Sequence, residues 1–511
     1  MISQFRYTSA ILDKIPSVTT AFSVKISRIQ IECTEYNVII ITVGRTMQFT
    51  ELFVSDILTP AVITLLAVAG IAVFVHVRPF AVLRTAAATK RRGDVGGSSL
   101  SAMLTALAGT LGVGNISGVA LAIACGGCGA VFWMWVSALL AMAVKYAEIL
   151  LASHYRIIKK DGSHGGAPIY IKRAFKGGTG KALSLLFTVL CMVASLTVGS
   201  SVQSGAAAEI AQYAFGVHPA LCGVVMAICV TICISGGSKR IGKVTDVLVP
   251  LMSGAYIILS LWVIIKETHR LPSIFSMIIR SAMNTRSAAG GAVGFGIAAM
   301  RYGVSRGLIS NEAGCGTAPF AHARAEREPA EQGIFGIAEV CIDTVIMCTL
   351  TAITVIAAYG GNVPKNTAGM VIVCEAYGKY IGAAAPGLLC VAVILFAFGS
   401  IICWYYYGIE CLLLSGAKRT AKHCFAAAFI ICISFGAVVN GRIVWLCADL
   451  CFDMLLALNT ITVLKELGTV KKVTDTYLYR FKKQSVRSST ARSLLSQGKA
   501  RAMPHSETEA P

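Results

Sequence analysis

Long apolar stretches recur from position 57 to position 465, and they restrict the fold of this chain more than any other feature. Each stretch runs for about 20 residues, the length that an α-helix needs to cross a lipid bilayer. Inside a bilayer every backbone N–H and C=O group must be bonded within the protein, so only helices and closed barrels can span it. The stretches are too long and too continuous for barrel strands. We therefore expect an all-α polytopic membrane protein.

The stretches predict about 11 transmembrane helices between two polar ends. The expected spans are 57–77, 101–125, 130–156, 183–213, 219–236, 244–265, 290–321, 333–358, 385–413, 423–439 and 443–465. Residues 1–46 have mixed charges and no long apolar core, so we interpret them as a disordered arm or a mis-assigned start. The membrane domain then covers 47–467, and the basic, Ser-rich residues 468–511 are expected to form a disordered cytoplasmic tail.

The charged residues support this interpretation and indicate an orientation. They make up only 14% of the chain, whereas about a quarter is usual in soluble domains. The net charge of +20 would suggest nucleic acid in a soluble protein, but Lys and Arg gather here in alternate loops such as 78–92 and 156–181. Cytoplasmic loops of membrane proteins carry this excess. We predict a cell-membrane protein whose surroundings are lipid and not nucleic acid, with the N-terminus outside and the C-terminus in the cytoplasm.

The second span contains the sequence LGVGNISG (111–118), which places three glycines and an asparagine near the depth of the bilayer centre. Glycine lets a helix unwind without steric hindrance, and lipid cannot bond the backbone groups that unwinding frees. A ligand, an ion or another helix must bond them instead. Close packing of small residues between helices is the alternative explanation.

A second glycine-interrupted span, 290–321, holds the corresponding position in the other half of the chain. The halves, 101–265 and 290–465, have five spans each and therefore opposite orientations in the membrane. Matching interrupted helices in two inverted repeats indicate a secondary transporter whose broken helices form the substrate site. The span 57–77 is then an extra N-terminal helix.

Glycine, polar and aromatic residues near these breaks are the candidate ligands. Freed N–H groups attract a carboxylate and freed carbonyls attract a cation, and a polar side chain in mid-membrane needs a partner. The candidate substrate contacts are Gly112, Gly114, Asn115, Gln203, Gly294, Phe295, Ser400 and Trp404. The candidate ion ligands are Gly112, Val113 and Ser400. We expect the second break at residues 294–296, with Asn311 and Glu312 after it in gating or structural roles.

Two pairs of charged residues also lie in the spans. Lys145 and Glu148, three residues apart on one helical face, can neutralise each other. Glu339 and Asp343 cannot, and because they lie near the start of their span we expect them to face solvent, with a proton relay as the alternative. No nucleophile–base set or phosphate-binding loop is recognisable. The sequence therefore indicates neither an enzyme nor ATP-driven transport, and no cofactor or metal is expected beyond a coupling ion.

Residues 111–156 strongly resemble the alanine or glycine:cation symporter family, the sodium:alanine symporters. The segments 235–252, 305–323, 331–352 and 396–411 resemble it too, so the likeness covers about 55–467. The resemblance implies a leucine-transporter-like fold, a 5+5 inverted repeat preceded by one extra helix. It also implies sodium-coupled import of a small neutral amino acid, alanine or glycine, and leaves the oligomeric state open.

The chain departs from the family pattern at positions that bear on the coupling ion. Val113 stands where the family usually has threonine, and Gly399 stands where it has the first hydroxyl of a Ser-Thr pair. The resemblance therefore leaves a proton-coupled transporter of another amino acid or amine as an alternative, with Glu339, Asp343 and Asp453 as the proton carriers. A membrane-embedded enzyme or a non-transporting sensor is the more distant alternative.

Overall fold

The computed structural model describes residues 50–88, 97–159, 162–283, 292–365, 367–439 and 442–483 of the chain. The chain divides into two units, residues 1–58 and residues 59–511. In the first unit the described residues 50–58 are helical and include the π-helix η2 (Val54–Leu58). The predicted arm, residues 1–46, lies outside the described residues.

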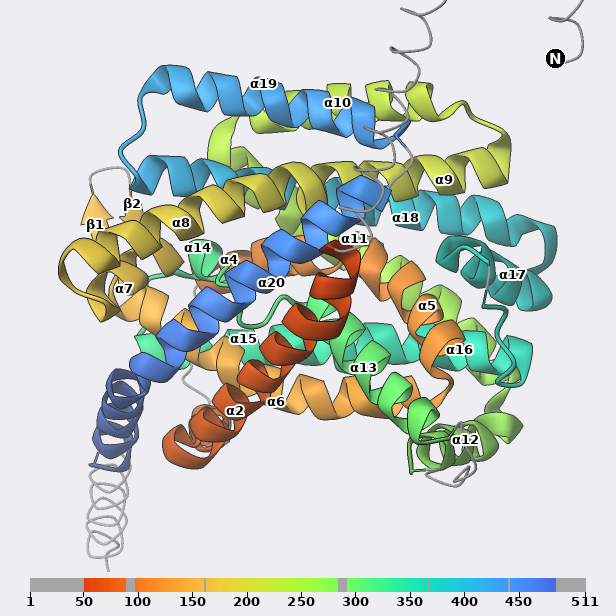
Figure 1. Ribbon diagram of the computed structural model, residues 1–511, viewed down its shortest axis with the longest axis horizontal. Helices are drawn as coiled ribbons and strands as arrows, with labels where there is room; N and C mark the ends of the chain where they lie inside the picture. The colour runs from red at the N-terminus through yellow and green to blue at the C-terminus, as the bar shows by residue number, and fades with distance from the viewer. Residues whose placement is uncertain are drawn as a thin grey trace, which may run out of the picture. The chain divides into compact units, whose positions relative to one another are not determined.

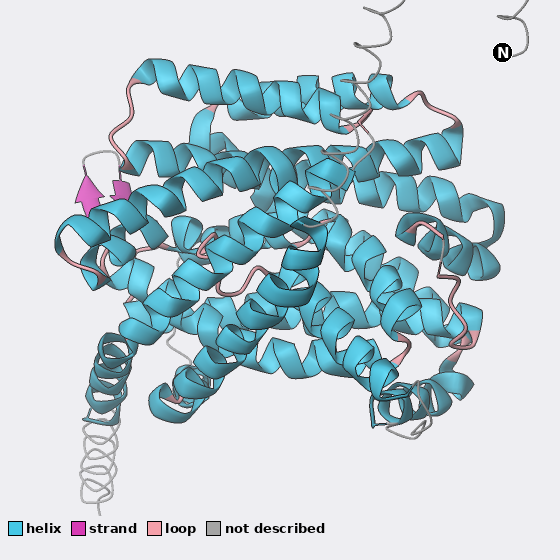
Figure 2. Ribbon diagram, viewed as in Figure 1, coloured by secondary structure: helices cyan, strands magenta, loops and turns pink. Residues whose placement is uncertain are grey.

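Helices make up nearly all of the described second unit (Figure 2). Its helices are α2 (Thr59–Val77), α3 (Pro79–Ala88), α4 (Gly97–Thr110), η3 (Val113–Asn115), α5 (Ser117–Gly126), α6 (Gly129–His154), α7 (Ala167–Ala174), α8 (Gly177–Leu196), η4 (Thr197–Val202), α9 (Gln203–Phe215), α10 (Pro219–Ile234), α11 (Gly237–Lys266), η5 (Thr268–Arg270), α12 (Leu271–Met283), α13 (Ala292–Asn311), α14 (Pro319–His322), α15 (Pro329–Val340), η6 (Cys341–Cys348), α16 (Thr349–Tyr359), α17 (Gly369–Ile381), η7 (Gly382–Ala384), α18 (Ala385–Leu414), α19 (Arg419–Gly436) and α20 (Arg442–Lys465). Between α6 and α7, β1 (Ile157–Lys159) and β2 (Gly162–His164) pair antiparallel, with Ile157 opposite His164.

The helices agree with the predicted all-α membrane architecture. Within the described ranges, seven helices are long and apolar enough to cross a membrane, or eight if the bent pair 98–110 and 113–126 is one span. Each of the predicted spans overlaps one or more helices, but some of these helices are short, such as α10 with 16 residues. The exact number of spans stays a prediction.

Two groups of helices surround the interrupted segments (Figure 1). In the first, α6 packs against α13, α15 and α2, while α5 lies against α13. In the second, α18 packs against α8, α9 and α11, and α10 lies beside α19. Glycine allows the closest approach in the first group, because a Cβ atom on Gly303 of α13 would lie 2.2 Å from the carbonyl oxygen of Ala130 in α6.

The predicted disordered tail is partly wrong. Residues 467–483 continue as a helix after α20. Val470 and Thr474 on this helix are fully buried, and Thr474 Oγ1 lies 2.8 Å from the hydroxyl oxygen of Tyr146 in α6. Composition suggested disorder here, but apolar and hydroxyl residues on one face find partners in the bundle. Residues 484–511 lie outside the described part.

Candidate functional site

The first predicted break is present. Helix α4 ends at Thr110 and α5 begins at Ser117, with a single 3₁₀ turn between them and a bend of 64°. Asn115 stabilises this turn, since its Oδ1 accepts a hydrogen bond of 3.1 Å from the Gly112 N–H. Ser117 Oγ donates to the Val113 carbonyl at 3.0 Å. Side chains of the segment itself thus bond part of the backbone that the break frees.

The second break lies further along the chain than predicted. Helix α13 is continuous from Ala292 to Asn311, so the expectation of unwinding at Gly294–Gly296 is wrong. The break comprises residues 312–318, where Glu312, Gly314 and Gly316 have φ angles of 50°, 85° and 76°. Gly294 and Phe295 lie about 25 Å of helix rise before it. The glycines at 294 and 296 permit an unwound backbone but do not require one. Helix α13 ends instead at the left-handed residues from Glu312 onward, which Pro319 follows.

The two breaks are joined by one buried set of hydrogen bonds. Asn115 Nδ2 donates to Ser310 Oγ at 2.8 Å and to Asp343 Oδ1 at 2.7 Å. Ser310 Oγ in turn donates to Asp343 Oδ2 at 2.8 Å. Asp343 belongs to η6, a π-helical segment of the kind that often marks functional sites. We call Asn115, Ser310 and Asp343 the junction.

The prediction that Glu339 and Asp343 face solvent is wrong, because their exposed fractions are 1% and 0%. Gln332, Glu339 and Asp343 are spaced by seven and four residues, so they share one helical face. That face is directed into the bundle. This spacing was the signal in the sequence that could have identified a buried polar row.

A second polar contact lies on the other side of the first break. Gln203 Oε1 accepts a hydrogen bond of 3.3 Å from the Val113 N–H. Ser400 Oγ donates at 3.2 Å to the carbonyl oxygens of Ala108 and Gly109. A Cβ on Gly112 would lie 2.8 Å from Ser400 Oγ, so this approach requires glycine. The structure therefore brings the predicted residues of the first break, α9 and α18 together.

Trp404 is fully buried beside this region. Its ring packs edge-on against Tyr407 with 5.6 Å between ring centroids. A Cβ on Gly199 would lie 2.3 Å from the Cβ of Trp404, so the backbone of the π-helix η4 touches the tryptophan. Trp404 therefore packs against the backbone of η4. It does not line the cavity described next.

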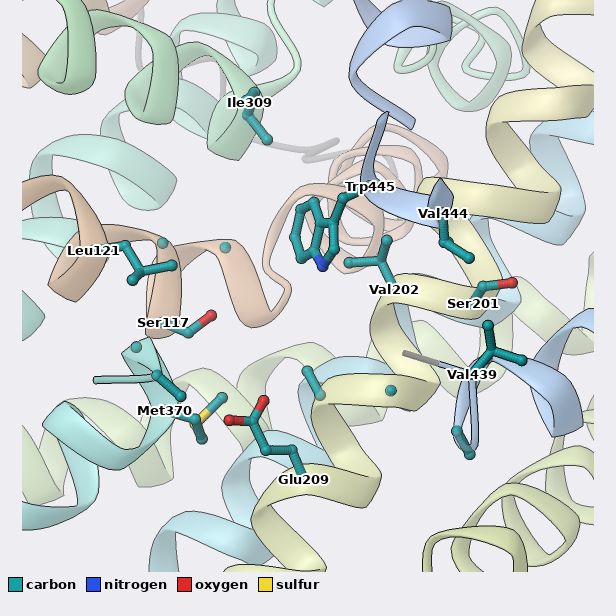
Figure 3. Close-up of a pocket in the computed structure, with 18 of the residues that line it drawn as sticks. Ser117, Leu121, Ser201, Val202, Glu209, Ile309, Met370, Val439, Val444 and Trp445 are labelled. Carbon is teal, nitrogen blue, oxygen red and sulfur yellow. The ribbon is translucent and has the colours of Figure 1, made fainter. Parts of the chain in front are cut away.

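A cavity of about 540 Å³ lies among α5, α9, α13, α17 and α20. Gly114, Val202 and Ile309 line it, and each is a chain neighbour of a polar residue of the breaks or of α9. Figure 3 shows Glu209 of α9 among the lining side chains, and Arg306 of α13 also lines the cavity. Among the predicted substrate contacts Gly114 lines this cavity, whereas Asn115, Gln203, Ser400 and Trp404 are buried.

A buried charge cluster supports the second break. Lys145 Nζ lies 3.9 Å from Glu148 Oε1, as the sequence predicts, and also 3.9 Å from Glu339 Oε2. It donates to the carbonyl of Asn311, the last residue of α13, at 3.1 Å. Glu148 Oε2 accepts hydrogen bonds from Gly316 N at 3.1 Å and from Asn459 Nδ2 at 2.8 Å. One pair of α6 side chains thus bonds the residue before the break and a residue within it.

Asn311 and Glu312 bond the break from within. Glu312 Oε2 accepts a hydrogen bond of 2.6 Å from Thr317 Oγ1 across the unwound segment. Asn311 Oδ1 accepts from the Ala313 N–H at 3.0 Å, and its Nδ2 donates to Thr344 Oγ1 at 3.1 Å. These contacts favour the structural role over the gating role that the sequence also allowed.

Comparison with known proteins identifies the relatives of this chain. Residues 42–491 match the model of the sodium:alanine symporter family. The amino-acid carrier protein AlsT of Bacillus subtilis is 35% identical over 405 residues, which cover 79% of this chain and 85% of that protein. The sodium/alanine symporter AgcS of Methanococcus maripaludis is 34% identical over 391 residues, which cover 75% and 84%.

The fold is similar to that of a solved transporter. The crystal structure of MhsT in complex with L-phenylalanine matches with a TM-score of 0.52 and covers 74% of this chain and 98% of that chain. Sequence identity is 12%, so the likeness concerns the fold alone. The leucine-transporter-like fold expected from the sequence is confirmed.

Proposed function

The chain belongs to the sodium:alanine symporter family, and we propose that it imports alanine or glycine together with sodium by alternating access. Membership makes it a multi-pass, cation-coupled amino-acid symporter and not an enzyme. The observation that carries the more specific proposal is the junction, where side chains from two interrupted helices and a π-helix meet next to the cavity. Such interrupted helices hold substrate and ion in transporters built from inverted repeats.

The amino acid is proposed to bind between the two breaks. Its carboxylate would lie beside Gly114 in the first break, next to the N-terminus of α5, where the helix dipole favours negative charge. The backbone of Gly114 already faces the cavity. The helix η4, which lines the cavity and whose backbone packs against Trp404, would limit the length of the substrate side chain, which favours a hydrogen or a methyl group. Gly294 and Phe295 remain predicted contacts with no support from the position of the break.

Sodium is proposed to bind at Ser400 and the freed carbonyls of α4. The Ser400 hydroxyl lies 3.2 Å from the oxygens of Ala108 and Gly109 and 3.5 Å from that of Leu111. Oxygen atoms are the ligands that hard cations prefer. Asp343 in the junction supplies a carboxylate and is the alternative cation position. Coupling follows if the bound cation stabilises the state that binds the amino acid.

The cavity provides the proposed access route. Ala368 and Val439, which line it, belong to the connections before α17 and α20. Both connections are on the outer side in the topology predicted from the Lys and Arg residues. In that orientation the conformation described here is open to the outside, and transport would require one helix group to rock against the other.

The test is uptake of radiolabelled alanine into proteoliposomes under an inward sodium gradient or an equal choline gradient. We expect accumulation with sodium only. Ser400→Ala should raise the sodium concentration for half-maximal uptake by about two- to tenfold, the worth of one or two hydrogen bonds. Ser195→Ala removes another fully buried hydroxyl, whose hydrogen bond goes to the Cys191 carbonyl of the same helix α8, and should leave sodium dependence unchanged. Equal uptake in choline would refute the proposal.

A further inference from the structure

The buried charge cluster contains more carboxylates than its cation can neutralise. Lys145 faces Glu148 and Glu339, each at 3.9 Å, and Glu312 also lies within its electrostatic range. The exposed fractions of these four residues are between 0% and 3%. One ammonium therefore faces three carboxylates in the membrane interior, where an unmatched charge is costly by several kcal/mol.

Two carboxylate oxygens of the cluster lack hydrogen bonds. Glu148 Oε1 and Glu339 Oε2 are buried, and neither has a hydrogen-bond partner among the described residues. Both are the oxygens nearest to Lys145 Nζ. The remaining oxygens are bonded, Glu148 Oε2 by Gly316 and Asn459. A proton added to the cluster therefore has two acceptor atoms that no other donor occupies.

His322 fixes which atoms of this region can take the proton. Ser99 Oγ donates to Gln332 Oε1 at 2.9 Å, which directs the Gln332 amide nitrogen at His322 Nδ1, 2.6 Å away. The other ring nitrogen, Nε2, bonds to Glu339 Oε1. Both imidazole nitrogens of His322 therefore already have hydrogen-bond partners. An added proton would instead bind to a carboxylate oxygen that has no such partner. Ala321, next to His322, and Ser98, next to Ser99, line a separate cavity of about 320 Å³, which brings solvent close to this end of the cluster.

We propose that the cluster of Lys145, Glu148, Glu339 and His322 is a proton-binding site that exchanges its proton with solvent as the transporter binds its coupling cation. The proton is taken from water and forms an O–H bond at Glu148 Oε1 or Glu339 Oε2, and the same bond breaks when the proton returns to water. Other titratable groups facing these residues are Glu312, Cys315, Asp343, Tyr170, Cys403 and Tyr407. This inference rests on one part of the proposed function, the binding of a coupling cation at the breaks.

The hydrogen bonds give the direction of the coupling. Lys145 bonds Asn311 just before the second break, and Glu148 bonds Gly316 within it. Ser310, the chain neighbour of Asn311, belongs to the junction. A cation bound at the breaks repels a proton in the cluster. Sodium binding therefore releases a proton, and by reciprocity an acidic medium weakens sodium binding.

The experiment measures protons released when sodium chloride, with choline chloride as the reference, is added to the purified full-length protein in weak buffer. Alanine is added afterwards, and thermal unfolding of the same samples reports sodium and alanine binding. We expect the release of up to one proton per chain when sodium binds, measured over a series of pH values. The sodium concentration for half-maximal stabilisation should rise by up to about tenfold for each unit of acidification, as for one competing proton.

Two variants and a control assign the site. Glu339→Gln and Glu148→Gln each replace one carboxylate by a neutral amide, which removes the excess negative charge that the proton would neutralise, so either should abolish release and flatten the pH dependence while sodium still stabilises the protein. Asp453→Asn removes another buried carboxylate, which accepts a hydrogen bond from Thr59 Oγ1 at 2.5 Å, and should release protons as the unmodified chain does.

Sodium binding without proton release at any pH would overturn the proton site, and so would release that persists in both glutamine variants or disappears only in Asp453→Asn. Proton release by sodium without any effect of alanine would support the proton site and refute the proposed substrate instead. The two failures are therefore distinguishable.

Discussion

Adding one methyl group at Gly112 tests the proposed cation site directly. A Cβ there would lie 2.8 Å from Ser400 Oγ, closer than real Cβ contacts, and 3.1 Å from Gln203 Oε1, tighter than most of them. In Gly112→Ala the serine hydroxyl must leave the carbonyl oxygens of α4. Overpacking of this kind costs about 1–3 kcal/mol, which corresponds to a factor of about 5 to 150 in affinity if all of it acts on sodium binding.

The assay is the sodium dependence of alanine uptake in proteoliposomes, with thermal unfolding in sodium or choline as the check on folding. Gly254→Ala in α11 is the matched control, because the same methyl group there meets no atom within 4 Å. The double variant Gly112→Ala, Ser400→Ala removes the colliding hydroxyl, so its sodium affinity should be no weaker than that of Ser400→Ala alone. Unchanged sodium dependence in Gly112→Ala, or an equal loss in Gly254→Ala, would refute the reasoning.

Three further predictions concern the support of the breaks, the packing of the helices and the cavity. Asn459→Leu removes a donor to Glu148 Oε2 and to the Gly314 carbonyl, so the melting temperature should fall with a loss of about 1–3 kcal/mol; an unchanged melting curve would contradict this role. Gly303→Ala places a Cβ 2.2 Å from a carbonyl oxygen of α6, and we expect poor recovery of folded protein in size-exclusion chromatography, unlike Gly178→Ala, whose Cβ meets nothing within 4 Å. Glu209→Gln removes a negative charge from the cavity wall, so the KM for sodium should rise at low ionic strength and approach that of the unmodified chain at high salt. An increase in KM that is the same at low and high salt would exclude an electrostatic cause.

Local patterns in the sequence predicted part of the candidate site well. The break at 111–118 follows from glycines and an asparagine inside an apolar run, a conflict that only local unwinding resolves. Gln203 and Ser400 were expected near it because a polar side chain in mid-membrane needs a partner, and both bond the first break. The predicted position of the second break was wrong because the segment 290–321 contains two glycine-rich stretches, and either could have been unwound. Which of them is unwound depends on the neighbouring helices, and the local sequence does not contain that information.

The sequence by itself determined the membrane class, the helical architecture and the first break, because these depend on apolar length and on local backbone chemistry. Only the tertiary structure decided that Asp343 joins Asn115 and Ser310, residues separated by up to 228 positions, and that Glu339 shares Lys145 with Glu148. Hydropathy describes each helix alone and gives the same value to a carboxylate facing water and to one buried against a distant helix. The partner of a buried charge is fixed by which helices pack together, and that information lies in the three-dimensional arrangement.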